Sequence, residues 1–198
     1  CYKELDIGVA RPSIDELKEV PHHFIASHPV TDEKINARTF ETYALQKATE
    51  LFGEHNKIIM VGGSGLYIKA FCEGMDDIPD VPDEIRKKII KDYEQFGLSW
   101  LKKKLENADP AFYKSGEIEN PQRMMRALEV IETTGQSILI YRKGEKVKRN
   151  FNIIKIGLEL SKEELHRNIN ARVDQMLERG LVEEVKNLLP QKHLNALQ

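Results

Sequence analysis

The sequence predicts an α/β protein in which a parallel-sheet core is interrupted by an all-helical segment. A helical pattern over residues 36–52, an apolar run over 58–61, a glycine turn and a second helical pattern follow one another, the element order of a parallel sheet. Residues 83–149 show helical patterns without strands, and alternation over 151–160 returns the chain to the sheet. We therefore expect residues 1–82 and 150–198 to form the α/β core and residues 83–149 a helical insertion.

The stretch KIIMVGGSGLYIKAF, residues 57–71, is the expected corner of this sheet. Its apolar run indicates a strand buried on both faces, and Gly62, Gly63 and Gly65 permit a tight turn before the next helix. The stretch lacks the Gly-Lys-Ser/Thr ending of a phosphate-binding loop and the G-x-G-x-x-G spacing of a dinucleotide-binding turn. A structural turn and a ligand-facing turn both stay open on this evidence.

The composition is that of an ordinary globular protein, with 198 residues, 40% of them hydrophobic and 31% charged. No apolar run approaches the ~20 residues of a membrane span, and no leader sequence opens the chain, so we expect a cytoplasmic location. Two cysteines and six scattered histidines form no cluster with metal-ligand spacing. We therefore assign no metal-ligating residue in this chain.

The charge is distributed unevenly. The net formal charge is −6 over residues 1–82, +4 over 83–149 and zero over 150–198, which gives the overall −2. A basic segment in an otherwise acidic chain favours a polyanionic partner, although a solvated helical face would show the same charges.

The helix predicted over residues 121–134 is the best defined of the basic segment. Asn120 is a good N-cap, Pro121 suits the first helical position, and Gly135 marks the end. The helical periodicity puts apolar residues on one face and three polar ones near the opposite face: Gln122, Arg123 and Arg126. Two guanidinium groups and an amide beside a helix N-terminus can bind phosphates or base edges, and a solvated face explains them equally well.

The last part of the chain contains a further helix after the predicted strand. A capping box of Ser161 and Glu164 begins a helix that runs to residue 179. We expect this helix to bury an apolar stripe, made of Leu165, Ile169, Val173, Met176 and Leu177. Arg172 lies at the edge of the stripe, where it can snorkel or reach into a site.

Five stretches, in the same order along nearly the whole chain, resemble the bacterial tRNA dimethylallyltransferases, the isopentenyl-tRNA transferase family. YKELDIGVARPS resembles the family segment Y-x-x-x-D-I-G-T-A-K-P, and VPHHFI resembles V-P-H-H-L-I. VGGSGLYIKAFCEG is similar to V-G-G-T-x-L-Y-x-K-A-L-x-x-G, and NPQRMMRALEV to D-P-Q-R-x-x-R-A-L-E-V. NARVDQMLERGLVEEV resembles x-x-R-x-x-x-M-L-x-x-G-L-x-x-E-V.

The resemblance implies a P-loop kinase-like core, with a helical insertion that binds the anticodon arm of tRNA. It implies transfer of the dimethylallyl group of dimethylallyl diphosphate to N6 of the adenosine 3′ of the anticodon, with Mg²⁺ as cofactor. It also implies a monomeric protein that does not associate with a membrane. The family's phosphate-binding loop, its Asp base and the expected Mg²⁺ ligands would lie upstream of Cys1, and a further tRNA contact would lie after Gln198. We therefore expect the intact protein to be active and the chain as given to be inactive.

Site residues follow by matching positions. Ser64 matches the family's Thr after the paired glycines Gly62 and Gly63, near adenosine or diphosphate, and Arg172 matches an arginine that reaches the diphosphate. The residues that match tRNA-contacting positions are Tyr2, Arg86, Gln122, Arg123 and Arg126. Two alternatives stay open: an adenylate isopentenyltransferase that acts on a free nucleotide, and a non-catalytic tRNA-binding or degenerate kinase-like protein.

Overall fold

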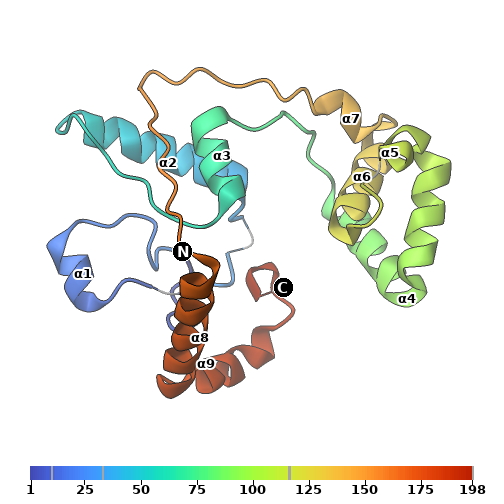
Figure 1. The fold of residues 1–198 in the computed structure, drawn as a ribbon. Coiled ribbons are helices and arrows are strands. Elements are labelled where there is room, and N and C mark those ends of the chain that lie inside the picture. Colours follow the sequence, from blue (N-terminus) through green and yellow to red (C-terminus); the bar gives the residue numbers. More distant parts are fainter. Residues whose placement is uncertain (10, 33, 116, 198) are drawn as a thin grey trace. The chain divides into compact units, whose positions relative to one another are not determined.

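Helices form the regular structure in the computed structural model, which describes residues 1–9, 11–32, 34–115 and 117–197 (Figure 1). They are α1 (Ile14–Glu19), α2 (Ala37–Phe52), α3 (Gly65–Glu73), α4 (Asp83–Ala108), α5 (Pro110–Lys114), α6 (Pro121–Thr134), α7 (Ile138–Tyr141), α8 (Lys162–Glu178) and α9 (Leu181–Leu188), with short 3-10 turns η1 (Leu189–Gln191) and η2 (Asn195–Leu197). The chain divides into two compact units, residues 1–39 with 153–198 and residues 40–152. The larger unit contains α3 and most of α2 as well as α4–α7, so it is larger than the helical insertion predicted over residues 83–149. The predicted domain boundaries stay a prediction.

The described residues contain one isolated parallel bridge, between Tyr2 and His28, and no strand. The segments 58–61 and 151–160 belong to no helix or strand, and Ile59, Val61 and Leu158 are 94%, 86% and 97% exposed. The burial predicted for 58–61 is therefore wrong in this structure. An apolar pattern favours a strand, but a strand forms only where a neighbouring backbone supplies a ladder of hydrogen bonds, and the described residues form no such ladder here. The parallel-sheet core stays a prediction.

Helices α4–α7 pack around a hydrophobic core of their own. α4 lies along α6, and α5 and α7 complete the cluster. Its fully buried side chains include Ile89, Leu101, Leu105, Phe112, Met124, Leu128, Val130 and Ile138. The amphipathic pattern of each helix places these side chains inward, so burial of apolar surface holds the four helices together.

The boundaries of α6 confirm the signals in the sequence. The side chain of Asn120 accepts the backbone N–H of Arg123 at 3.1 Å, Pro121 is the first helical residue, and Gly135 ends the helix with φ +69°. Gly97, with φ +73°, interrupts the helical backbone inside α4. Local chemistry therefore determines where these helices begin, end and bend.

The chain segments that enter and leave α4–α7 are hydrogen-bonded to each other. The N–H of Val147 donates to the carbonyl of Glu73 at 2.8 Å, and the N–H of Gly144 donates to the Asp76 carboxylate at 2.9 Å. Beside them, Arg149 donates to the carbonyl oxygens of Ala70 and Phe71, both at 2.8 Å, at the end of α3. The two segments are thereby connected independently of the helices between them.

In the smaller unit, Glu184 of α9 binds three consecutive backbone amides near the start of the chain. Its carboxylate accepts N–H groups of Asp6 at 2.9 Å, Ile7 at 2.8 Å and Gly8 at 3.0 Å. Partial burial alone would raise the pKa of Glu184, but these hydrogen bonds and the nearby Arg11 guanidinium outweigh it and lower the pKa below the usual 4.5. Glu184 therefore binds the backbone of residues 6–8 in its ionised form.

Replacing Glu184 with glutamine is expected to lower the free energy of unfolding at pH 7 by about 1 kcal/mol, because the amide loses charge-assisted hydrogen bonds and solvent screens part of their strength. A carboxylate with a lowered folded pKa stabilises above its unfolded pKa and loses this effect as pH falls through the folded pKa. The difference between wild type and variant should therefore shrink below about pH 4.5. Urea unfolding at pH 7 and pH 4 measures the difference in free energy of unfolding, and Glu183→Gln is the control. Equal losses of stability at both pH values would contradict the prediction.

Helix α8 begins as predicted but does not bury its stripe. The Ser161–Glu164 capping box is confirmed, with the Ser161 hydroxyl oxygen accepting the N–H of Glu164 at 3.2 Å. Leu165, Ile169 and Val173 are nevertheless 46%, 49% and 47% exposed. The predicted burial of the stripe is wrong in this structure, because periodicity defines an apolar face but not an element that covers it.

Candidate functional site

Ser64 lies at the N-terminus of α3, directly after the glycine turn. Its carbonyl oxygen accepts two N–H groups of the first helical turn, from Tyr67 at 2.9 Å and Ile68 at 3.1 Å. The Ser64 hydroxyl forms no capping bond and is exposed. It is therefore free to donate to, or accept from, a ligand at this end of α3.

Gly62 and Gly63 precede Ser64 in an exposed segment. Neither has a positive φ, and a Cβ atom added to either would meet no atom within 4 Å. Nothing in the described structure therefore requires glycine at these two positions. After the turn, Tyr67 of α3 stacks on Phe40 with ring centroids 4.9 Å apart, and burial raises the pKa of the Tyr67 hydroxyl above its usual value.

Two arginines predicted to contact tRNA meet at one buried carboxylate. Arg86 of α4 donates from Nε to Oε1 of Glu129 at 3.3 Å, and Arg126 of α6 donates from a terminal nitrogen to Oε2 of Glu129 at 3.0 Å. The Glu129 side chain is 6% exposed, whereas those of Arg86 and Arg126 are 45% and 30% exposed. The structure thus brings together two positions that lie 40 residues apart.

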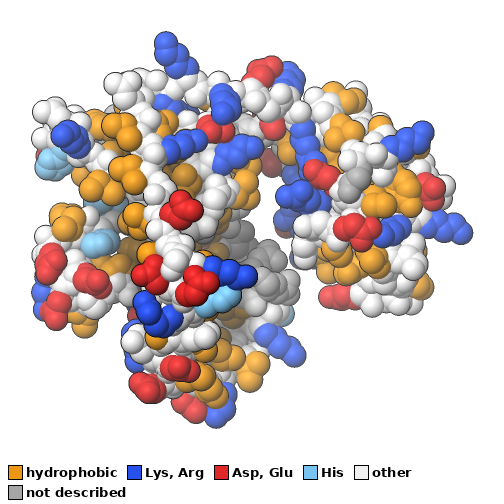
Figure 2. Space-filling view, viewed as in Figure 1, with side chains coloured by type: hydrophobic (Ala, Val, Ile, Leu, Met, Phe, Trp, Pro, Cys, Tyr) orange, Lys and Arg blue, Asp and Glu red, His pale blue; other side chains and the backbone are white. Residues whose placement is uncertain are grey.

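The other polar residues of α6 lie at its exposed N-terminal turn. Gln122 and Arg123 are exposed, and Arg123 forms a loose ion pair with Glu117 at 3.6 Å. Glu117 also accepts a hydrogen bond from Arg142 at 2.8 Å. The predicted polar face is therefore split, because Gln122 and Arg123 face solvent while Arg126 is engaged by Glu129. On the part that carries α4–α7, Lys and Arg side chains lie at the surface among acidic and hydrophobic ones (Figure 2).

Tyr2 and Arg172 belong to the smaller unit, whereas Ser64 and the predicted site residues of α4 and α6 belong to the larger one. The carbonyl of Tyr2 accepts a hydrogen bond from Arg11 at 2.9 Å, which fixes the backbone there. Arg172 is exposed on α8, and its side chain makes no hydrogen bond or ion pair with the described residues.

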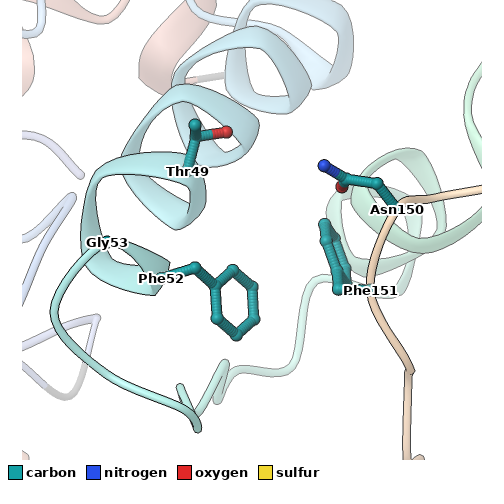
Figure 3. A pocket seen from close by; sticks show the side chains of 5 residues that line it. All are labelled: Thr49, Phe52, Gly53, Asn150 and Phe151. Carbon is teal, nitrogen blue, oxygen red and sulfur yellow. The ribbon is translucent and has the colours of Figure 1, made fainter.

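A pocket of about 370 Å³ lies beside the end of α2, lined by Thr49, Phe52, Gly53, Asn150 and Phe151 (Figure 3). The rings of Phe52 and Phe151 face it, with centroids 5.4 Å apart. It contains none of the predicted site residues. Within the described parts of the chain, no three His, Cys, Asp or Glu side chains are placed to hold a metal ion, and no helix is long and apolar enough to cross a membrane.

Sequence reasoning missed Glu129 as part of this site. The available signal was a glutamate three residues after Arg126, within the otherwise apolar run Ala127 to Val130. A charged residue at a core position needs a buried partner. Glu129 therefore could have been predicted to pair with an arginine, but not with Arg86 in particular.

Two solved structures share this fold. A tRNA isopentenylpyrophosphate transferase from Bacillus halodurans is 30% identical, with a TM-score of 0.58 over 100% of this chain and 60% of that chain. A eukaryotic dimethylallyltransferase acting on tRNA is 22% identical, with a TM-score of 0.70 over 98% of this chain and 48% of that chain, and supports the fold alone. The fold is thus the one found in isopentenylpyrophosphate transferases.

A family model described as IPP transferase matches residues 1–198, and the chain belongs to this family. Among its relatives, the tRNA dimethylallyltransferase of Christiangramia forsetii is 45% identical over 196 residues, which are 99% of this chain and 65% of that protein. The chain therefore spans about two thirds of the length of that relative. The family resemblance read from the five motifs is confirmed.

Proposed function

We propose that this protein transfers the dimethylallyl group of dimethylallyl diphosphate to N6 of the adenosine 3′ of the anticodon in tRNA. The observation that carries the proposal is the family match, which runs over the whole chain and includes every predicted site residue. The basic character of residues 83–149, and the exposed Arg86, Gln122 and Arg123 on packed helices, support an RNA substrate. A free nucleotide would not require such a surface.

In this reaction, a bond forms between N6 and C1 of the dimethylallyl group, the bond from C1 to the diphosphate oxygen breaks, and N6 loses a proton to a base. The adenosine must leave its stack to reach the site. We propose that the free Ser64 hydroxyl hydrogen-bonds the flipped adenosine or the diphosphate. We propose that the Arg172 guanidinium stabilises the negative charge on the departing diphosphate.

The glycine turn fits this role. Because Gly62 and Gly63 are not required by the described backbone, close approach of a ligand to that backbone would account for them. Side chains at these positions would then collide with substrate and not with the protein. This supports the ligand-facing reading of the turn over the purely structural one.

We further propose that the extended segments 58–61 and 151–160 belong to a P-loop kinase-like parallel sheet, which their apolar patterns support. Mg²⁺ would neutralise charge on the diphosphate. The described residues offer no cluster suited to hold it, so we derive no step through Mg²⁺. The monomeric state and the cytoplasmic location stay predictions.

The test incubates the full-length protein with unmodified tRNA, radiolabelled dimethylallyl diphosphate and Mg²⁺. Label is expected at N6 of the adenosine 3′ of the anticodon. Arg172→Gln is expected to lower kcat by about 10²–10³, the effect of removing one group that stabilises transition-state charge. Ser64→Ala should lower activity, whereas Ser64→Thr, which keeps the hydroxyl, is the matched control and should not. Label on free AMP would identify the adenylate enzyme instead, and tRNA binding without label on either would identify a binding protein.

A further inference from the structure

Glu129 is a buried acidic side chain on α6, whose other buried residues are apolar. Within the described residues, it and Asp109 are the buried acidic side chains, and the neighbours of Glu129 on α6 include the fully buried Leu128 and Val130. Its two carboxylate oxygens each accept one guanidinium hydrogen bond, Oε1 from Arg86 and Oε2 from Arg126. One buried carboxylate therefore sets the positions of two cations from different helices.

The two arginines are held differently. Arg86 uses only Nε, and its two terminal nitrogens, with four N–H donors, form no hydrogen bond with the described residues. Arg126 uses both terminal nitrogens, one toward Glu129 and the other, at 3.5 Å, toward the carbonyl of Pro79. Both terminal nitrogens of Arg86 are thus open to a phosphate, whereas each terminal nitrogen of Arg126 already donates one hydrogen bond within the protein.

We propose that Glu129 is a positioning residue for substrate RNA: it holds Arg86 by Nε so that the two terminal nitrogens bind one phosphate, while Arg126 supports Glu129 and does not contact RNA. The inference rests on the proposed function, because it takes the polyanion bound at α4 and α6 to be tRNA. This proposal differs from the family resemblance, which places Arg126 among the tRNA contacts: Arg126 here supports Glu129 and leaves the RNA contact to Arg86.

The sign of the effect separates positioning from simple charge. Removing a negative charge from a polyanion-binding surface should tighten binding by Coulomb's law. If Glu129 positions Arg86, its replacement by glutamine should weaken binding although the net charge becomes more positive. Glu132 is exposed on the same helix three residues later, so Glu132→Gln is the matched control for charge alone.

The experiment measures the Kd of the full-length protein for unmodified tRNA at several salt concentrations. Arg86→Gln and Glu129→Gln are each expected to raise Kd roughly tenfold, and Arg86→Gln should reduce the salt slope by about one. The double variant should bind no more weakly than Arg86→Gln, because both changes remove the same contact. Arg126→Gln should leave the salt slope unchanged, and Glu132→Gln should leave Kd equal or lower.

Additive effects of Glu129→Gln and Arg86→Gln would overturn the positioning role, and a slope reduced by about one in Arg126→Gln would return Arg126 to direct contact. Thermal unfolding identifies a variant that does not fold. In that case Arg86→Lys tests the proposal instead. Lysine keeps the positive charge but lacks the planar guanidinium group, so Kd should rise while the salt slope stays unchanged. An unchanged Kd would overturn the proposal. A wild-type protein that does not bind tRNA would refute the proposed function instead.

Discussion

Replacing Arg149 with methionine is expected to lower the free energy of unfolding by about 3–5 kcal/mol, because it leaves a carboxylate uncompensated. Arg149 is 9% exposed and lies 2.5 Å from Glu41, which is 17% exposed. It also satisfies the carbonyl oxygens of Ala70 and Phe71 at the C-terminal end of α3. One side chain therefore connects α2, the end of α3 and the segment that leaves α7.

Urea unfolding measures this loss. Removing the charge of the partner as well, in Arg149→Met with Glu41→Gln, should recover part of it, since no unpaired carboxylate remains. Lys146→Met is the matched control, because Lys146 is 72% exposed and its ion pair with Glu73, at 3.4 Å, is solvated. A loss as small as that of the control would show that the contacts of Arg149 contribute little to the free energy of unfolding.

Replacing Gly74 with alanine is expected to destabilise the protein by about 2–5 kcal/mol. Gly74 ends α3 with φ +82° and ψ 177°, a region that is essentially restricted to glycine. An added Cβ would also lie 2.6 Å from Cγ2 of Val147, on the segment hydrogen-bonded to Glu73. Backbone strain and overpacking therefore act together at one position.

Gly97 separates the two causes. It has nearly the same backbone conformation, φ +73° and ψ −169°, but an added Cβ would meet nothing within 4 Å. Gly97→Ala should therefore show the strain alone, about 1–3 kcal/mol. Val147→Ala, introduced into Gly74→Ala, should recover part of the remaining difference, because it removes Cγ2 but leaves the Cβ of residue 147, 3.2 Å from the added methyl group. Thermal and urea unfolding compare the four proteins, and equal losses for the two glycine variants would exclude the predicted contact with Val147.

The candidate site shows how far the sequence could predict it. The family resemblance assigned both Arg86 and Arg126 to tRNA contact, and in the structure both side chains donate to the same carboxylate, that of Glu129. The resemblance could not distinguish the open terminal nitrogens of Arg86 from those of Arg126, which each donate a hydrogen bond within the protein. That difference depends on Glu129, which lies 43 residues from Arg86 in the chain. Through-space pairing of this kind leaves no periodic signal.

The sequence by itself determined the helix boundaries, because a cap involves groups only three residues apart: Ser161 with Glu164, and Asn120 with the N–H of Arg123. It also determined the family, through motifs distributed over the whole chain. Only the tertiary structure decided which apolar faces are covered and which charges are paired. Leu128 is buried while Leu165, on the apolar face of another amphipathic helix, is 46% exposed, since burial and ion pairing depend on what another part of the chain brings within contact distance.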